Sequence, residues 1–210
     1  MMRRVPRTVL ALALGSACIA ARAEAGSVEF GPHIDFPLPI ADVGNTELGL
    51  GGGFTVSATQ DSWTSVGLDL AYHYWPASSE YKAAFDDFLR VASYQVINDS
   101  TWAFSTLQAS LYFKLRAPVE GPVVPWISVG LGVYRLNYNL SGLTNVSNIS
   151  YQSGYSGSVG VDFPTGAGTK LGLDLSYQEL WSREMEGSLG PTQRPAFSAW
   201  TAGVHLLFTR

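Results

Sequence analysis

The amino-acid sequence predicts an all-β protein, folded as an eight-stranded antiparallel up-and-down transmembrane β-barrel. Three observations predict it: many segments alternate strictly between apolar and polar residues, the connections between them are alternately short and long, and charges are scarce. Charged residues make up 14% of the 210 residues, whereas soluble domains carry about 25%. The low charge and the mean hydropathy of +0.10 argue against disorder and against a basic surface, so no nucleic-acid partner is expected.

The N-terminus has the composition of a secretory signal peptide. Three arginines precede the apolar run 8–21, and small residues suited to cleavage follow it. We predict that residues 1–23 are removed, or 1–25 if the second cleavage site is used, and that residues 24–210 form the barrel domain. An N-terminal membrane anchor is one alternative, although a transmembrane helix needs about 20 apolar residues. A lipoprotein signal at Cys18 is the other. Cleavage would remove the single cysteine, so no disulfide or cysteine metal site is expected.

Period-two alternation marks the strands. In the segment 170–178, KLGLDLSYQ, apolar side chains fall on one face and polar or small ones on the other. The segment 65–74 alternates likewise and shares the pattern G-L-D-L-x-Y with it. Pro32 and Pro37 weaken the first strand, because proline cannot donate to a ladder. Each segment is long enough to cross a bilayer as a tilted strand, which takes about 9 to 11 residues. The predicted strands are 28–38, 46–58, 63–75, 101–115, 124–137, 149–163, 169–181 and 196–208.

The lengths of the connections predict which end of the barrel is which. Connections after the second, fourth and sixth strands are short and rich in Gly and Pro, whereas those after the third, fifth and seventh are long. This asymmetry is typical of bacterial outer-membrane barrels, whose turns are periplasmic and whose loops are extracellular. In the longest connection, apolar residues after Ser78 and Ser79 recur at helical spacing, which predicts a short amphipathic helix, with extended strands as the alternative. They are Tyr81, Ala84, Phe85, Phe88, Leu89 and Ala92.

Residue size predicts which face of the strands lines the lumen. One face consists of Gly, Ser, Ala and Thr with sparse polar residues, which suits the crowded interior of an eight-stranded barrel. The opposite face is aliphatic and is expected to meet lipid, with aromatic girdles at the two membrane interfaces. A soluble barrel with an aromatic core is the alternative. The predicted girdles contain Tyr72, Tyr74, Trp75, Trp102, Phe104, Tyr138, Tyr151, Tyr155, Trp181 and Trp200 at the long-loop end, and Trp63, Phe113, Trp126, Phe163 and Phe208 at the short-turn end.

Polar residues on the inward face predict an internal ion-pair network. Asp69 and Asp174 occupy equivalent positions in the shared pattern, and an isolated charge in a narrow lumen is too costly. We predict that a network plugs the lumen, the alternative being a hydrated path for small solutes. Its members are Asp69, Asp174, Lys114, Lys170, Asp162, Glu47 and His73, with Glu29 and Asp35 also pointing inward.

One cation has the opposite orientation. The parity of Arg135 predicts that it points outward near the extracellular end, where it could contact a lipopolysaccharide phosphate. A rim residue that snorkels to water is the alternative.

Together these features make residues 24–210 similar to the small outer-membrane β-barrels of the OmpA, OmpX and OmpW type, the porin-family outer-membrane β-barrel domains. The resemblance implies location in the outer membrane of a Gram-negative bacterium and insertion by the barrel-assembly machinery. It also implies contact with outer-membrane lipid and lipopolysaccharide, and a monomer. The chain departs from the pattern at its end: such barrels end on an aromatic residue, whereas Thr209 and Arg210 follow Phe208.

The expected function is a structural or surface-interaction role through the extracellular loops. The alternatives are a narrow channel for small or apolar solutes, a lipid A-modifying enzyme, and a soluble periplasmic lipocalin-like carrier. The lipid A deacylases that resemble this barrel carry His-x-Ser, and none of the three histidines has serine two positions on. His33 with Asp35, or His73 with Ser78 or Ser79, could imitate the grouping of lipid A palmitoyltransferases. No catalytic, cofactor-binding or metal site is predicted, since a metal site needs three or four converging ligands.

Overall fold

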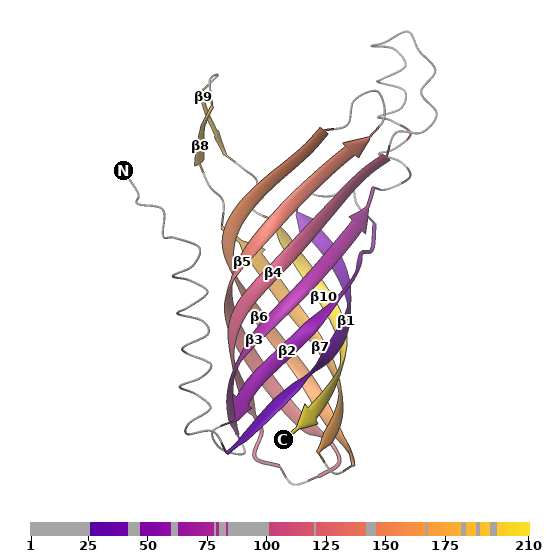
Figure 1. The fold of residues 1–210 in the computed structure, drawn as a ribbon, viewed down its shortest axis with the longest axis vertical. Helices are drawn as coiled ribbons and strands as arrows, with labels where there is room; N and C mark the ends of the chain where they lie inside the picture. The colour runs from indigo at the N-terminus through magenta and orange to yellow at the C-terminus, as the bar shows by residue number, and fades with distance from the viewer. Residues whose placement is uncertain are drawn as a thin grey trace.

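Eight strands close into one barrel, and a short two-stranded hairpin lies outside it (Figure 1). This computed structural model describes residues 26–41, 47–59, 63–77, 79, 83, 101–119, 121–141, 146–166, 168–181, 184–187, 190–193 and 197–210. The barrel strands are β1 (Ser27–Ala41), β2 (Leu50–Thr59), β3 (Thr64–Pro76), β4 (Thr101–Arg116), β5 (Val124–Ser141), β6 (Val146–Gly166), β7 (Thr169–Leu180) and β10 (Ser198–Thr209), and the hairpin is β8 (Glu184–Gly187) with β9 (Gly190–Gln193).

Two predictions fall outside this part of the chain. The predicted signal peptide and the apolar residues of the predicted helix in the longest connection lie outside the described residues. Within the described residues, no helix is long and apolar enough to span a membrane.

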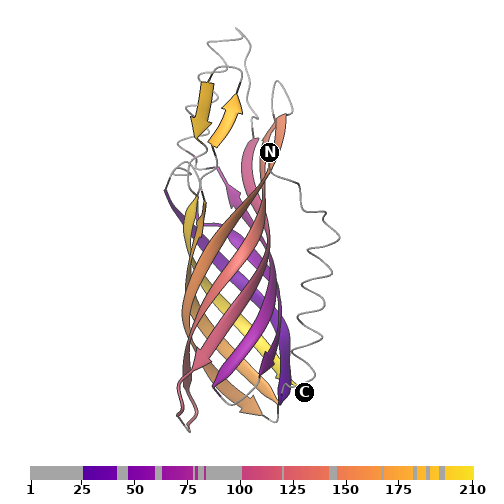
Figure 2. The ribbon, with the colours of Figure 1, turned by 90° about the vertical axis from the view of Figure 1, so that its left-hand side faces the viewer.

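The strands pair antiparallel in the order β1-β10-β7-β6-β5-β4-β3-β2, so the first and last strands close the barrel. Following the paired residues once around the wall from Glu29 leads back to Pro39 of the same strand, ten residues further along. This stagger tilts the strands against the barrel axis, as Figures 1 and 2 show. The predicted eight-stranded antiparallel up-and-down barrel is therefore confirmed.

The strand bounds differ from the predicted ones in places. β5 continues to Ser141 and β6 begins at Val146, so their hairpin is longer at the extracellular end than predicted. The hairpin β8–β9 lies in a connection predicted as a plain loop, because strands of four residues leave too short a periodic signal. β1 contains three prolines, Pro32, Pro37 and Pro39, and its pairing with β10 skips Gly31 and Pro32. Pro32 has no N–H to donate to the ladder there.

Alternation in every barrel strand separates an apolar outer face from a polar lumen. Outward aliphatic side chains are exposed, with Val129 at 64% and Leu131 at 62%. In the described barrel strands, every Asp, Glu, Lys, Arg and His faces the lumen except Arg135 and Glu179. A water-facing surface would carry many more charges, and this distribution is that of a membrane barrel. The structure thus favours the lipid-facing assignment over the soluble barrel.

The predicted aromatic girdles are present in part. Outward aromatic side chains are exposed near both ends: Tyr72, Tyr74, Tyr151, Tyr155, Trp181 and Trp200 at the extracellular end, and Trp63, Phe113 and Phe208 at the periplasmic end. The prediction is wrong for Trp75, Phe104 and Trp126, which are buried in the lumen because each occupies an inward position of its strand. The side chains of Trp102 and Tyr138 lie outside the described part.

Candidate functional site

The lumen is filled in three layers, and the layer nearest the extracellular end is apolar. Trp75, Phe104 and Phe197 form an aromatic cluster whose ring centroids lie 5.1 to 5.4 Å apart. All three side chains are almost inaccessible to solvent. Tyr134, Leu136, Leu180 and Ala199 complete the layer. Such a layer opposes the passage of ions, because an ion would lose its hydration there without gaining a partner.

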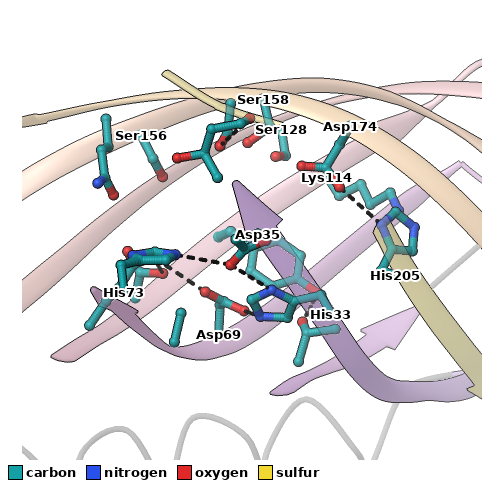
Figure 3. Close-up of a pocket in the computed structure, with 18 of the residues that line it drawn as sticks. His33, Asp35, Asp69, His73, Lys114, Ser128, Ser156, Ser158, Asp174 and His205 are labelled. Atoms are coloured by element: carbon teal, nitrogen blue, oxygen red, sulfur yellow. Dashed lines mark hydrogen bonds and ion pairs between the residues drawn. The ribbon is translucent and has the colours of Figure 1, made fainter. Parts of the chain in front are cut away.

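A polar cavity of about 140 Å³ lies in the middle of the lumen (Figure 3). On one side of it, His33 and Asp35 of β1 meet Asp69 and His73 of β3. The two ring nitrogens of His33 lie 2.9 Å from a carboxylate oxygen of Asp35 and 2.9 Å from one of Asp69. The Nε2 atom of His73 lies 2.9 Å from the Asp35 carboxylate, and Gln108 donates to Asp69 at 3.2 Å. Two imidazoles and an amide therefore hold these two carboxylates.

The third layer, at the periplasmic end, consists of ion pairs. Glu29 of β1 accepts hydrogen bonds from Arg116 of β4 and Lys170 of β7. Lys114 donates to Asp162 of β6 at 3.1 Å. Glu29 and Asp162 are 2% and 0% exposed, so these charges are removed from bulk water. Buried charges are tolerated only when paired, and each of these carboxylates has at least one cationic partner.

His205 of β10 connects the cavity to the periplasmic layer. Its Nδ1 atom lies 3.1 Å from Asp174, beside the cavity, and its Nε2 atom lies 2.9 Å from Asp162 in the ion-pair layer. Trp126 also donates its indole N–H to Asp162, at 2.7 Å. The ammonium of Lys114 lies 3.9 Å from the centroid of the Trp126 ring. The ion pairs and the cavity are therefore one continuous network.

Inward-facing glycines provide the space for the imidazole rings. A Cβ atom at Gly53 would lie 2.5 Å from Nε2 of His33, and one at Gly172 would lie 2.0 Å from Nε2 of His205. Real Cβ atoms do not approach other heavy atoms so closely, so a larger residue would displace the ring. The small residues of the inner face thus position the histidines, besides fitting the narrow barrel.

The geometry of His33 and His205 also fixes the charge balance of the lumen. Each ring has both nitrogens beside carboxylate oxygens. A neutral imidazole carries one N–H, so its second nitrogen would direct a lone pair at a carboxylate. The doubly protonated ring satisfies both hydrogen bonds of His205, whereas Nε2 of His33 lies at ion-pair distance from Asp69 without a hydrogen bond to it. With these two rings charged, two imidazolium rings and three lysine or arginine side chains match five carboxylates in number: Lys114, Arg116 and Lys170 with the two rings, against Glu29, Asp35, Asp69, Asp162 and Asp174.

Most of the predicted network lies together in the lumen. Asp69, Asp174, Lys114, Lys170, Asp162 and His73 each contact another member or an inward histidine or carboxylate. Glu47 does not belong to it. Glu47 precedes β2, is exposed, and accepts a hydrogen bond from the backbone N–H of Ser79 at 3.2 Å. The inward parity of the strand does not extend to Glu47, because β2 begins only at Leu50.

Several lumen residues that contact the network were not among its predicted members, Gln108 among them. Arg116 falls in the predicted turn after the fourth strand. It lies on the same face as Lys114, so a predicted strand one residue longer would have placed it in the lumen. His33 and His205 have inward parity, which was the available signal. Trp126 was assigned to a girdle. Among the described residues, no group of three or more His, Cys, Asp or Glu could hold a metal ion.

Comparisons with known proteins agree with this architecture. Neisserial surface protein A (NspA) has 11% sequence identity and a TM-score of 0.55, over 87% of this chain and 98% of that chain. Outer membrane protein OprG from Pseudomonas aeruginosa has 10% identity and a TM-score of 0.52, over 89% and 97%. A major outer membrane protein from Thermus thermophilus has 10% identity and a TM-score of 0.55, over 88% and 100%. At these identities the likeness concerns the fold.

The sequence itself matches a family. No curated protein matches the chain, but the family model described as outer membrane protein beta-barrel domain matches residues 9–208. That match covers all eight barrel strands almost to their ends. The chain therefore belongs to the outer membrane protein β-barrel domain family and is a protein of the bacterial outer membrane.

Proposed function

We propose that this protein is a closed, non-conducting outer-membrane barrel with a structural or surface-interaction role through its extracellular loops. The observation that carries the proposal is the filling of the lumen by two different layers in series. An aromatic layer with Trp75 and Phe104 lies at the extracellular end, and an ion-pair layer with Glu29 and Arg116 lies at the periplasmic end. Either layer alone opposes the passage of a hydrated ion.

The two layers block passage for different physical reasons. In the apolar layer an ion would lose its water without finding a polar partner. In the ion-pair layer a permeating ion would have to separate charges that are almost completely buried, and breaking a buried pair costs about 3 to 5 kcal/mol. Because the lumen is closed in this way, ligands would bind at the connections at the extracellular end. Loops on a rigid scaffold often carry function.

Conductance in planar lipid bilayers tests the proposal. The refolded full chain is compared with three variants: Trp75→Ala with Phe104→Ala, Arg116→Ala with Lys170→Ala, and all four changes together. A gel of unboiled samples checks that each variant forms the compact barrel. We expect no discrete conductance steps from the wild type or from either double variant. The quadruple variant should conduct, with preference for cations because Glu29 and Asp162 remain.

Conductance steps from the wild type would contradict the proposal. They would favour a narrow channel instead, for which the polar cavity of about 140 Å³ is the supporting observation. A closed quadruple variant would show that other residues close the lumen. The enzyme alternative has its own measurement, the mass of lipid A from cells that overproduce the protein, and an altered mass would favour it.

A further inference from the structure

The hairpin β8–β9 shares its register with the barrel hairpin β7–β10. Glu179 of β7 pairs with Ser198 of β10, and Glu184 of β8 pairs with Gln193 of β9. From the first pair to the second, each strand advances by five residues. Both pairs therefore fit one antiparallel register, and β8 and β9 form the outer part of one long hairpin that is interrupted beyond the barrel.

The interruption lies near a proline in the sequence. Pro195 stands between β9 and β10, and proline has no N–H to donate to a ladder. Beyond the interruption, β8 and β9 form a separate two-stranded sheet, and Figures 1 and 2 both show it apart from the extracellular end of β6. The long hairpin thus has a point at which its direction can change.

The strand β6 extends beyond its pairing with β7. The ladder between these two strands ends at Gly154, although β6 begins at Val146 and stays paired with β5 over that whole length. Among the strands that the structure describes, none pairs with residues 147–150 on the side of β7. We call these four residues the free edge of β6. An unpaired edge readily accepts a further strand.

Continuing the register of β6 and β7 brings β8 to this free edge. Gly154 pairs with Leu180, so five residues further along each strand Ile149 would lie opposite Met185. β8 begins at Glu184 and ends at Gly187, so all four of its residues fall opposite the free edge. The strand that the edge lacks is therefore present in the same chain, in the matching register.

The unpaired backbone groups match as well. Trp181 donates its N–H to the carbonyl oxygen of Ser153 at 2.9 Å, and residues of a strand bond alternately to its two sides. In the continued register, Met185 would therefore direct its N–H and C=O toward β6, and Ile149 directs its own toward β7. These two residues can exchange a pair of backbone hydrogen bonds.

The side chains of the two strands are also compatible. Ile149 is 46% exposed, and in the continued register the apolar Met185 would cover it from the neighbouring strand. On the other face Ser150 would lie opposite Glu184, so a polar residue meets a polar one. Cross-strand pairs of this kind contribute to the stability of antiparallel sheets.

We propose that the β8–β9 hairpin has a second position, in which β8 pairs with the free edge of β6 and extends the barrel wall on the extracellular side. In this position residues 147–150 are closed to an extended segment of another protein. Only four residues of β8 take part, so the pairing adds few hydrogen bonds and the hairpin exchanges between its two positions. The inference goes beyond the proposed function, because it holds whether or not the lumen conducts.

A disulfide tests the second position. Asn148→Cys is combined with Glu186→Cys in a Cys18→Ser chain, which has no other cysteine. The two positions would form a pair without backbone hydrogen bonds, whose Cα atoms lie about 4.5 Å apart. Asn148→Cys with Glu184→Cys is the matched control, since that diagonal pair would be about 7 to 8 Å apart. In lipid vesicles the first pair should be oxidised at least about tenfold faster than the control, which is beyond the reach of a disulfide.

Equal rates for the two pairs, or no disulfide in either, would overturn the proposal. A gel of unboiled samples checks that each variant forms the barrel. Hydrogen exchange tests the pairing without cysteines: the Ile149 amide should be protected, and Met185→Pro should lower that protection several-fold by removing an N–H directed toward β6. Thr192→Pro is the control, since the bond from Leu180 to Phe197 sets a register in which the Thr192 N–H points away from β8. Equal losses in both variants, or an unprotected Ile149 amide in the wild type, would also overturn it.

Discussion

The imidazole of His205 occupies the space in which any side chain at position 172 would begin. A Cβ atom on Gly172 would lie 2.0 Å from Nε2 of His205 and 2.3 Å from Cε1. The ring cannot move aside cheaply, because Asp162 and Asp174 hold both of its nitrogens. The glycine and the two carboxylates thus define one position for this histidine.

Gly172→Ala should therefore destabilise the barrel. We expect the free energy of unfolding to fall by about 1 to 3 kcal/mol, the usual range for overpacking, as measured by urea unfolding in lipid vesicles. Gly157→Ala on β6 is the matched control, since a Cβ atom there would meet its nearest neighbour at 4.0 Å. The control should change stability by less than about 0.5 kcal/mol. Equal stability of the two variants would contradict the close packing of His205 against Gly172.

Removing the carboxylates that hold the histidines should also weaken the barrel. Asp69 and Asp174 each contact a ring nitrogen, of His33 and His205 respectively. Asp69→Asn with Asp174→Asn keeps the shape but removes two charges, and a hydrogen bond to a charged group is worth about 1.5 to 3 kcal/mol. Unfolding of this double variant in vesicles should show a loss of that size per site. If stability did not change, the lumen network would not contribute to folding.

The protonation of the histidines is directly measurable. Nitrogen NMR of the barrel labelled at histidine should show His33 and His205 with protons on both ring nitrogens at neutral pH. His73 serves as the internal comparison, because one nitrogen meets Asp35 whereas the other faces the Thr106 hydroxyl at 3.5 Å. A single protonated nitrogen on either His33 or His205 would contradict the charge balance of the lumen.

Glu29 and Arg116 should be coupled energetically. Each of Glu29→Gln and Arg116→Gln leaves a buried charge short of a partner, whereas the double variant removes both. A double-mutant cycle should then give an interaction energy of about 0.5 to 3 kcal/mol. The cycle of Arg116→Gln with Glu179→Gln, which lies on the outer wall, should be additive. Additivity in the first cycle would show that the pair does not act as a unit.

Alternation and connection lengths were sufficient to predict the fold, because a barrel wall in lipid imposes a period of two on every strand. The same parity placed Asp69, Asp174 and Asp162 in the lumen. It could not say which groups meet, since Lys114 and Asp162 lie on strands β4 and β6, which are not neighbours, and come together over the inner face of β5. Such a contact depends on the stagger of the closed barrel, which no local pattern encodes.

Position along the strand was a weaker guide than parity. Trp75 stands at a strand end, which favoured an interfacial aromatic, but its inward parity places it in the apolar layer. For Glu47 it was parity that misled, because this residue precedes β2 and the alternation of the strand does not apply to it.

The charged residues of the lumen also favour one register of β10, the strand that closes the barrel. If β10 slipped by one residue against β7, His205 would turn into lipid and an aliphatic neighbour would turn into the lumen. If it slipped by two, His205 would lie opposite Asp174 or Lys170 instead of Gly172, without the space that the glycine provides. Each neighbouring register is penalised by an unpaired charge or a steric clash. The charges that fill the lumen therefore also select a single way of closing the barrel.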